Sequence, residues 1–170
     1  METTFKIKWV RIFEQSIFIW VNVILYPIAL FLIYPRVNRE QSYWLLIFVS
    51  LYFGVLIIPG LKIFFNYFKK SRKLELQITK DFVRLVDNGT GGTKELSFLE
   101  IDFVNVCQNT YPTSRRPWSE FAYIIFQSKT TRLLIPSFVA TYSELRKSGV
   151  FEKIPENIIL IEGFFLPTIP

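Results

Sequence analysis

The sequence contains no histidine among its 170 residues and only one cysteine, Cys107. Without histidine, the chain cannot assemble a Ser-His-Asp or Cys-His catalytic group, or any zinc site that needs imidazole. A single cysteine excludes a disulfide within the chain and fits a reducing compartment. Since Cys107 has no positively charged neighbour in the sequence, we predict a core thiol rather than a nucleophile.

Acidic residues are outnumbered by basic ones, 14 to 20, and those in the second half of the chain are dispersed. Glu100 and Asp102 are two positions apart, so on a strand they would share one face, as a pair of catalytic carboxylates could. The alternative, which we favour, is two solvated strand residues. We therefore predict that the protein is not an enzyme and uses no cofactor and no metal.

Apolar side chains are abundant: hydrophobic residues make up 51% of the chain and aromatic residues 18%. A soluble domain of this length would struggle to bury so much apolar surface. One run without charge extends from Ser16 to Tyr34, and a second from Tyr43 to Leu61. Each has about the 20 residues that a helix needs to cross a bilayer. Because the connection between them, residues 36–42, is short, we predict an antiparallel transmembrane hairpin.

Two residues inside these spans interrupt the apolar pattern. Asn22 is predicted to hydrogen-bond across to the second helix, the alternative being a pore or substrate contact. Pro59 is predicted to kink or end the second helix, because its ring clashes with the preceding turn. Beyond Pro59, we expect Ile63, Phe64 and Tyr67 to lie in the membrane interface.

Basic residues gather at the two ends of the predicted hairpin, whereas the connection carries only Arg36 and Arg39, offset by Glu40. Cytoplasmic loops are enriched in lysine and arginine, so we predict a multi-pass protein of the bacterial inner membrane with both termini in the cytoplasm. The predicted partner is the lipid bilayer, with anionic lipid at its surface, and not nucleic acid, because no recognition motif accompanies the charge. The residues predicted to contact the membrane surface are Lys62, Lys69, Lys70, Arg72 and Lys73.

After the basic stretch, the hydrophobic period changes from that of a helix to that of a strand. We predict three parts: a cytoplasmic N-terminal segment at 1–15, the hairpin at 16–68, and a cytoplasmic, mainly β domain at 69–170. The β domain is expected to fold alone from about Ser71. Its predicted strands cover residues 74–78, 82–86, 94–98, 101–107, 121–126 and 132–135.

Turn and cap signals support this division of the β domain. The stretch from Asn88 to Gly92 is typical of a β-hairpin turn, because asparagine and glycine accept positive φ at little cost. Thr141, followed three residues later by Glu144, predicts a capping box at the start of a helix. Gly149 is a typical residue at the end of such a helix.

The loop from Asn109 to Trp118 combines two arginines with two aromatic residues. Arginine suits phosphate or carboxylate groups, and tyrosine and tryptophan offer large contact areas. We predict that this loop binds a ligand, a protein partner or a second copy of the chain, the alternative being a solvated connection. The residues predicted to make the contact are Tyr111, Arg115, Arg116 and Trp118.

Two stretches of the second half carry a resemblance to known proteins. The first is LELQIT-KDFVRLVDNG-TGGTKELSFLEIDFVNV, and the second is RLLIPSFVATYSELRKSG, in which a strand ending in Ile135-Pro136 leads into the capped helix. With two spans and a basic stretch before them, they resemble the bacterial membrane-anchored pleckstrin-homology-like families, such as the YcxB-like proteins, from about Ser16 to Gly149. The resemblance implies a bent, nearly closed barrel of about seven strands with a C-terminal capping helix, and no general enzymatic activity. The turn at 79–81 is shorter than the long first loop with which phosphoinositide-binding members surround a headgroup.

These observations predict a non-enzymatic module, tethered to the membrane, that binds or holds a partner at the cytoplasmic face. Two alternatives stay open. One is a small ligand-gated membrane effector whose β domain senses a nucleotide-like second messenger. The other is a membrane immunity protein that captures a toxin.

Overall fold

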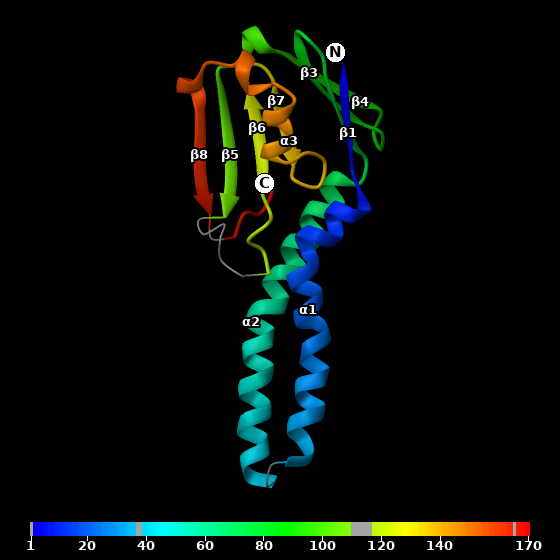
Figure 1. Cartoon of the computed structure of the whole chain (residues 1–170), viewed down its shortest axis with the longest axis vertical. Coiled ribbons are helices and arrows are strands. Elements are labelled where there is room, and N and C mark those ends of the chain that lie inside the picture. The colour runs from blue at the N-terminus through cyan, green and yellow to red at the C-terminus, as the bar shows by residue number, and fades with distance from the viewer. Residues whose placement is uncertain (1, 37–38, 110–116, 165) are drawn as a thin grey trace.

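Two long helices extend from one end of a compact β domain in the computed structural model, which describes residues 2–36, 39–109, 117–164 and 166–170 (Figure 1). Helix α1 spans Trp9–Ile33, a 3-10 turn η1 follows at Tyr34–Arg36, and helix α2 spans Arg39–Ser71. By length and composition, both helices could cross a membrane. Pro59 lies inside α2 and does not end it, so of the two predicted effects of this residue, a kink or an end of the helix, the end is wrong.

The two helices touch each other through a different polar contact from the one expected. The side-chain amide of Asn22 donates to the carbonyl oxygen of Phe18, at 2.7 Å, within its own helix. A hydrogen bond between the helices joins the hydroxyl groups of Tyr26 in α1 and Ser50 in α2, at 3.0 Å. A short polar side chain such as that of Asn22 can bond to the backbone carbonyl four residues earlier in its own helix, which gives it a partner without a second helix.

In the sequence, the helical hairpin lies between β1, at Thr3–Lys6, and β2, at Leu74–Ile78, two strands that are neighbours in one sheet. Strand β1 pairs antiparallel with β2, so that Thr3 lies opposite Ile78 and Lys6 opposite Glu75. Lys6 and Glu75 also form an ion pair at 2.9 Å. The first residues of the chain are therefore part of the β domain, whereas the sequence suggested a separate N-terminal segment.

The strands are divided between two four-stranded sheets. The first has the order β1-β2-β3-β4, with β3 at Phe82–Asp87 and β4 at Gly92–Ser97. The second has the order β7-β6-β5-β8. Its strands are β5 at Phe103–Asn109, β6 at Tyr123–Gln127, β7 at Arg132–Pro136 and β8 at Ile159–Phe164. Strand β8, which was not predicted, pairs parallel with β5 and forms an edge of the sheet.

Short helices complete the β domain. Helix α3, at Tyr142–Lys147, begins with the predicted capping box between Thr141 and Glu144. Three 3-10 turns occur as well: η2 at Phe98–Glu100, η3 at Phe151–Lys153 and η4 at Glu156–Ile158. Glu100 therefore lies in a 3-10 turn, not on a strand, and both Glu100 and Asp102 are exposed.

A first hydrophobic core lies between the two sheets, and α3 contributes Leu145 to it. Its most buried members from the sheets include Leu76, Phe126, Leu133 and Ile135. Burying each such side chain contributes about 1.5–3 kcal/mol. This core holds the sheets together as in a sandwich, and a closed barrel is not seen among the described strands.

A second core joins the helical hairpin to the other face of β6. Alternate side chains of a strand point to opposite faces, so Ile124 and Phe126 enter the first core while Tyr123 and Ile125 enter the second. The ends of α1 and α2 complete the second core with five buried side chains. These are Ile12, Ile19, Ile63, Phe64 and Tyr67.

The aromatic packing in this second core is close. The ring of Tyr67 lies 5.1 Å from that of Phe121 and 5.8 Å from that of Phe138, centre to centre. Tyr67 and Ile63 are 0% and 1% exposed, and Phe64 is 8% exposed. The sequence suggested that these three residues lie in a membrane interface, but they are buried against the β domain. The ends of both helices therefore belong to the domain itself.

Candidate functional site

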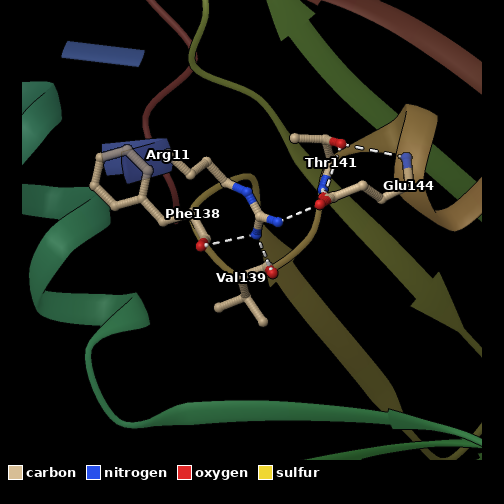
Figure 2. Close-up of polar contacts among 5 residues, drawn as sticks. All are labelled: Arg11, Phe138, Val139, Thr141 and Glu144. Atoms are coloured by element: carbon tan, nitrogen blue, oxygen red, sulfur yellow. Dashed lines mark hydrogen bonds and ion pairs between the residues drawn. The ribbon is translucent and has the colours of Figure 1, made fainter. Parts of the chain in front are cut away.

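A buried arginine fixes the start of α1 to the β domain. Arg11 is only 7% exposed, and its guanidinium donates to the carbonyl oxygen of Phe138, at 3.1 Å, and to that of Val139. The same group forms an ion pair with Glu144 at the start of α3 (Figure 2). A planar guanidinium with several donors can satisfy all three acceptors at once.

Glu144 is held from two sides. Its carboxylate accepts hydrogen bonds from the backbone N–H of Thr141, at 2.9 Å, and from the Thr141 hydroxyl, at 3.0 Å. Partial burial raises the pKa of Glu144, but these hydrogen bonds and the charge of Arg11 outweigh it, so the pKa is below its usual value. Glu144 is therefore charged at neutral pH and joins α1 to the capped end of α3.

The C-terminal tail is bound to α2 in a similar way. The hydroxyl of Tyr67 donates to the carbonyl oxygen of Pro167 at 2.7 Å. The side chain of Asn66 exchanges two hydrogen bonds with the backbone of Ile169, at 3.3 and 3.0 Å. Lys70 donates to the oxygen of Pro170 at 2.6 Å. This tail brings Ile169 to the wall of a nearby cavity.

That cavity, of about 740 Å³, lies where the end of α2 meets the first sheet and β7. We call it the basic cavity, because six of its lining residues are basic and one, Asp87, is acidic. The basic residues are Lys69, Lys70, Arg72, Lys73, Lys94 and Arg132. None of the six forms an ion pair with a carboxylate in the part of the chain that the structure describes.

The one carboxylate in the cavity is used by the chain itself. Asp87 accepts hydrogen bonds from the backbone N–H of Gly89, at 2.8 Å, and from the hydroxyl of Thr90, at 3.0 Å. The hydrogen bond from Gly89 is the main reason why the pKa of Asp87 is lowered, and the nearby charge of Lys73 adds to the effect. Asp87 thus stabilises the turn between β3 and β4.

Gly89 also allows Lys73 to take its position. A Cβ atom at residue 89 would lie 2.2 Å from Cδ of Lys73, closer than atoms can approach. The aliphatic part of Lys73 therefore lies against the turn, and a side chain at residue 89 would displace it. The exposed side chain of Lys73 thus lies beside the hairpin turn.

The predicted membrane-surface residues separate into two groups. Lys62 is exposed on α2, one residue after Leu61. Lys69, Lys70, Arg72 and Lys73 instead line the basic cavity together with Lys94 and Arg132. Sequence reasoning missed the last two because strands β4 and β7 are far from α2 in the chain.

The predicted contact loop is described only at its end. Tyr111, Arg115 and Arg116 lie outside the described residues. Trp118 is described, and its side chain is 3% exposed within the second core. The indole of Trp118 is therefore a core group in this structure, whereas the sequence suggested an exposed contact. The spacing of Trp118 and Phe121, both large and apolar, was the available signal that the loop returns to the core here.

Two further predictions concern chemistry. Cys107 is 2% exposed, and burial raises the pKa of its thiol, which confirms a core thiol. Its strand partner Tyr123 lies directly opposite, and burial raises the pKa of this phenol as well.

Among the described residues, there is no group of three or more histidine, cysteine, aspartate or glutamate side chains that could hold a metal ion. Glu100 and Asp102 border a shallow pocket beside Lys129.

One comparison with known proteins gives a match. The model of a family described as a PH domain matches residues 4–148, which include all but the first residue of β1, the helical hairpin, both sheets except β8, and α3. Neither the comparison with curated proteins nor that with solved structures found a match.

Proposed function

The chain belongs to this PH-domain family, and from this premise we propose that it is a non-enzymatic binding module held at the cytoplasmic face of a bacterial inner membrane by its helical hairpin. Within this family, we propose that the chain is related to the membrane-anchored, YcxB-like proteins. The observation that carries the proposal is the pairing of β1 with β2 on either side of the hairpin.

This pairing constrains how the chain could cross a bilayer. Strands β1 and β2 are neighbours, so the start of α1 and the end of α2 must lie on the same side. A chain that crosses the bilayer twice, once through each helix, returns to the side on which it started, whereas a chain that crosses once does not. The basic residues near both ends then favour the cytoplasm for this side.

Exposed apolar side chains support membrane insertion of the rest of the hairpin. Away from the β domain, large side chains such as Phe31, Trp44, Phe48, Leu51 and Ile58 are all more than half exposed. Contiguous apolar surface of this kind in water would lead to aggregation. In a bilayer it is the expected lipid-facing surface.

The second core supports a role for the helical hairpin in holding the β domain at a fixed orientation. A flexible linker would let a tethered domain take many orientations. Here the helix ends share a core and a buried ion pair with the β domain, so the domain is held at a fixed orientation to the hairpin. A binding surface on it would face its partner at a constant height above the membrane.

A second candidate function is a ligand-gated membrane effector. The observation that favours it is the lining of the basic cavity, which combines the end of α2 with residues of both sheets. A ligand there would contact the hairpin and the domain at once. Gating would require a second arrangement of these elements.

Reporter fusions test the proposed topology. A reporter that is active only outside the cytoplasm is fused after Asn38, in the connection between the helices, or after Pro170. We expect activity from the first fusion and none from the second, while the chain stays in the membrane after carbonate extraction. Activity from the Pro170 fusion, or release by carbonate, would overturn the proposal.

A further inference from the structure

The basic cavity holds more positive charge than the fold uses, although Lys70 donates to the oxygen of Pro170 at 2.6 Å. Six basic side chains and one carboxylate line it, and the carboxylate of Asp87 is bound to its own turn. Like charges placed together repel each other, and none of these six side chains forms an ion pair with a described carboxylate; Asp87 is near Lys73 but is bound to its own turn. Such a cluster is typical of a site for a multiply charged anion, and lysine and arginine are the residues that bind phosphate groups.

The wall of the cavity also has an apolar part. Leu74, Leu85, Leu134 and Ile169 line it together with the basic residues. A single inorganic phosphate would leave this part empty, since cavities of roughly 300–1,000 Å³ bind whole small molecules. The volume of about 740 Å³ falls in that range. The ligand therefore has an apolar or aromatic body as well as phosphate groups.

The height of the cavity indicates where the ligand comes from, and this step rests on the proposed function. Lys69 lies eight residues after Leu61, which is about 12 Å along a helix. The headgroup layer on each side of a bilayer is roughly 5–8 Å thick. If the hydrocarbon ends near Leu61, the cavity lies above the headgroups and opens to soluble molecules.

We propose that the basic cavity is a binding site for a ligand that carries two or more phosphate groups on an apolar or aromatic body, as nucleoside polyphosphates do. Lys73, which lies against the β3–β4 turn, and Lys94, on β4, bind the phosphates. Arg132 extends the charged surface onto β7, and Leu74 and Leu134 contact the body of the ligand. Gly89 positions Lys73 by leaving room for its aliphatic chain.

Calorimetric titration of the full chain tests this site. The chain is placed in nanodiscs of neutral phosphatidylcholine and titrated with ATP, without divalent cations, and then with pyrophosphate. Both faces of a nanodisc are open, so the result does not depend on topology, and a failure of the proposed orientation would leave it unchanged. We expect ATP to bind more tightly than pyrophosphate and both to weaken as salt is raised.

Three variants and a matched control locate the binding. Lys73→Gln and Lys94→Gln each remove an exposed charge without an ion pair, and each should weaken ATP binding about tenfold. Gly89→Ala keeps every charge but displaces Lys73, and should weaken binding as well. Lys147→Gln, which removes another exposed lysine, on α3 and outside the cavity, should leave binding unchanged.

Lipid headgroups are the other source of the same chemistry, and a second measurement distinguishes them. Native mass spectrometry of the chain from membranes containing phosphatidylglycerol counts retained anionic lipid. If the wild type does not bind ATP but retains phosphatidylglycerol, and Lys73→Gln and Lys94→Gln retain less of it, the cavity recognises the phosphate of a lipid and not that of a nucleotide. Absence of both, or equal weakening by Lys147→Gln, would overturn the proposed site.

Discussion

Arg11 and Glu144 are 133 positions apart in the sequence, yet their side chains form an ion pair that joins the start of α1 to the start of α3. The pair lies at the edge of the second core and is supported by the carbonyl groups of Phe138 and Val139. A buried charge is costly unless it is paired. The ion pair with Glu144 therefore fixes the position of the start of α1 against the β domain.

Removing this arginine should loosen the junction. Arg11→Leu leaves Glu144 and two buried carbonyl groups without their donor, which we expect to cost about 2–3 kcal/mol. For a chain of this size that corresponds to a fall in Tm of roughly 5–10 °C, measured by tryptophan fluorescence in detergent. Arg146→Leu, which removes an exposed arginine from the same helix as Glu144, should change Tm little. Equal Tm values for Arg11→Leu and the wild type would contradict the role assigned to the pair.

The ion pair should also make stability depend on pH in a defined direction. The pKa of Glu144 is lowered in the folded chain from the usual 4.5. A carboxyl group of this kind stabilises the fold above its unfolded pKa, and the contribution is lost as pH falls through its folded pKa. Glu144→Gln keeps a side chain suited to the capping box but removes the charge. The difference in Tm between wild type and Glu144→Gln should therefore be largest near pH 7 and shrink below about pH 4. A difference that stays constant over this range would show that the charge of Glu144 does not contribute.

Much of the β domain could be predicted because its strands alternate. The predicted strands at 74–78 and 82–86 match β2 and β3 closely, and the others lie within a few residues of those observed. The capping box of α3 was also predicted, because Thr141 and Glu144 have the required spacing. These features depend on near neighbours in the chain, which is why the sequence shows them.

The parts that were missed depend on distant partners. Strand β1 has only four residues and becomes a strand through its pairing with β2, in which Thr3 lies opposite Ile78, 75 positions later, and Lys6 opposite Glu75, 69 positions later. Trp118 looks like an exposed loop residue until the helix ends cover β6. The basic cavity likewise requires Lys94 and Arg132 to meet the end of α2. The contact loop with Tyr111, Arg115 and Arg116 stays a prediction.

At Gly60, helix α2 lies close to both α1 and the β domain. A Cβ atom there would lie 3.1 Å from Cγ1 of Ile19 and 3.3 Å from Cβ of Pro117. Gly60→Leu should therefore overpack the site and destabilise the chain by about 1–3 kcal/mol. Gly54→Leu is the matched control, because a Cβ atom at residue 54 of the same helix meets only Ile58, at 3.9 Å. Thermal unfolding in detergent compares the two, and an equal loss of stability would contradict the close approach.

The single thiol should be inert while the chain is folded. Cys107 is 2% exposed and its pKa is raised by burial, so both access and thiolate formation are suppressed. We expect maleimide labelling at pH 8 to be negligible in the folded chain and complete after denaturation. Ser143→Cys places a second thiol on an exposed position of α3 and should label within minutes. Rapid labelling of Cys107 in the folded wild type would show that the second core opens.

The second core changes what we expect of a β-domain fragment. A fragment from Ser71 retains β2 to β8 but loses β1 and every helix residue of the second core. The side chains of Phe121, Tyr123, Ile125 and Phe138 would then face water. We now expect this fragment to aggregate or to bind the dye ANS, although the sequence alone suggested that it folds by itself.

A redesigned chain should instead fold without a membrane. Residues 2–23 are joined to residues 56–170 through a flexible linker of about six glycine and serine residues, which spans the roughly 8–10 Å between packed helices. This chain keeps β1, both helix ends and the ion pair of Arg11, and it removes the exposed apolar part of the hairpin. We expect a soluble monomer with cooperative thermal unfolding and no ANS binding. The same chain with Arg11→Leu should unfold at a lower temperature, which ties its stability to the same junction. If the fragment from Ser71 proved as soluble and cooperative as the redesigned chain, the helix ends would not be part of the domain.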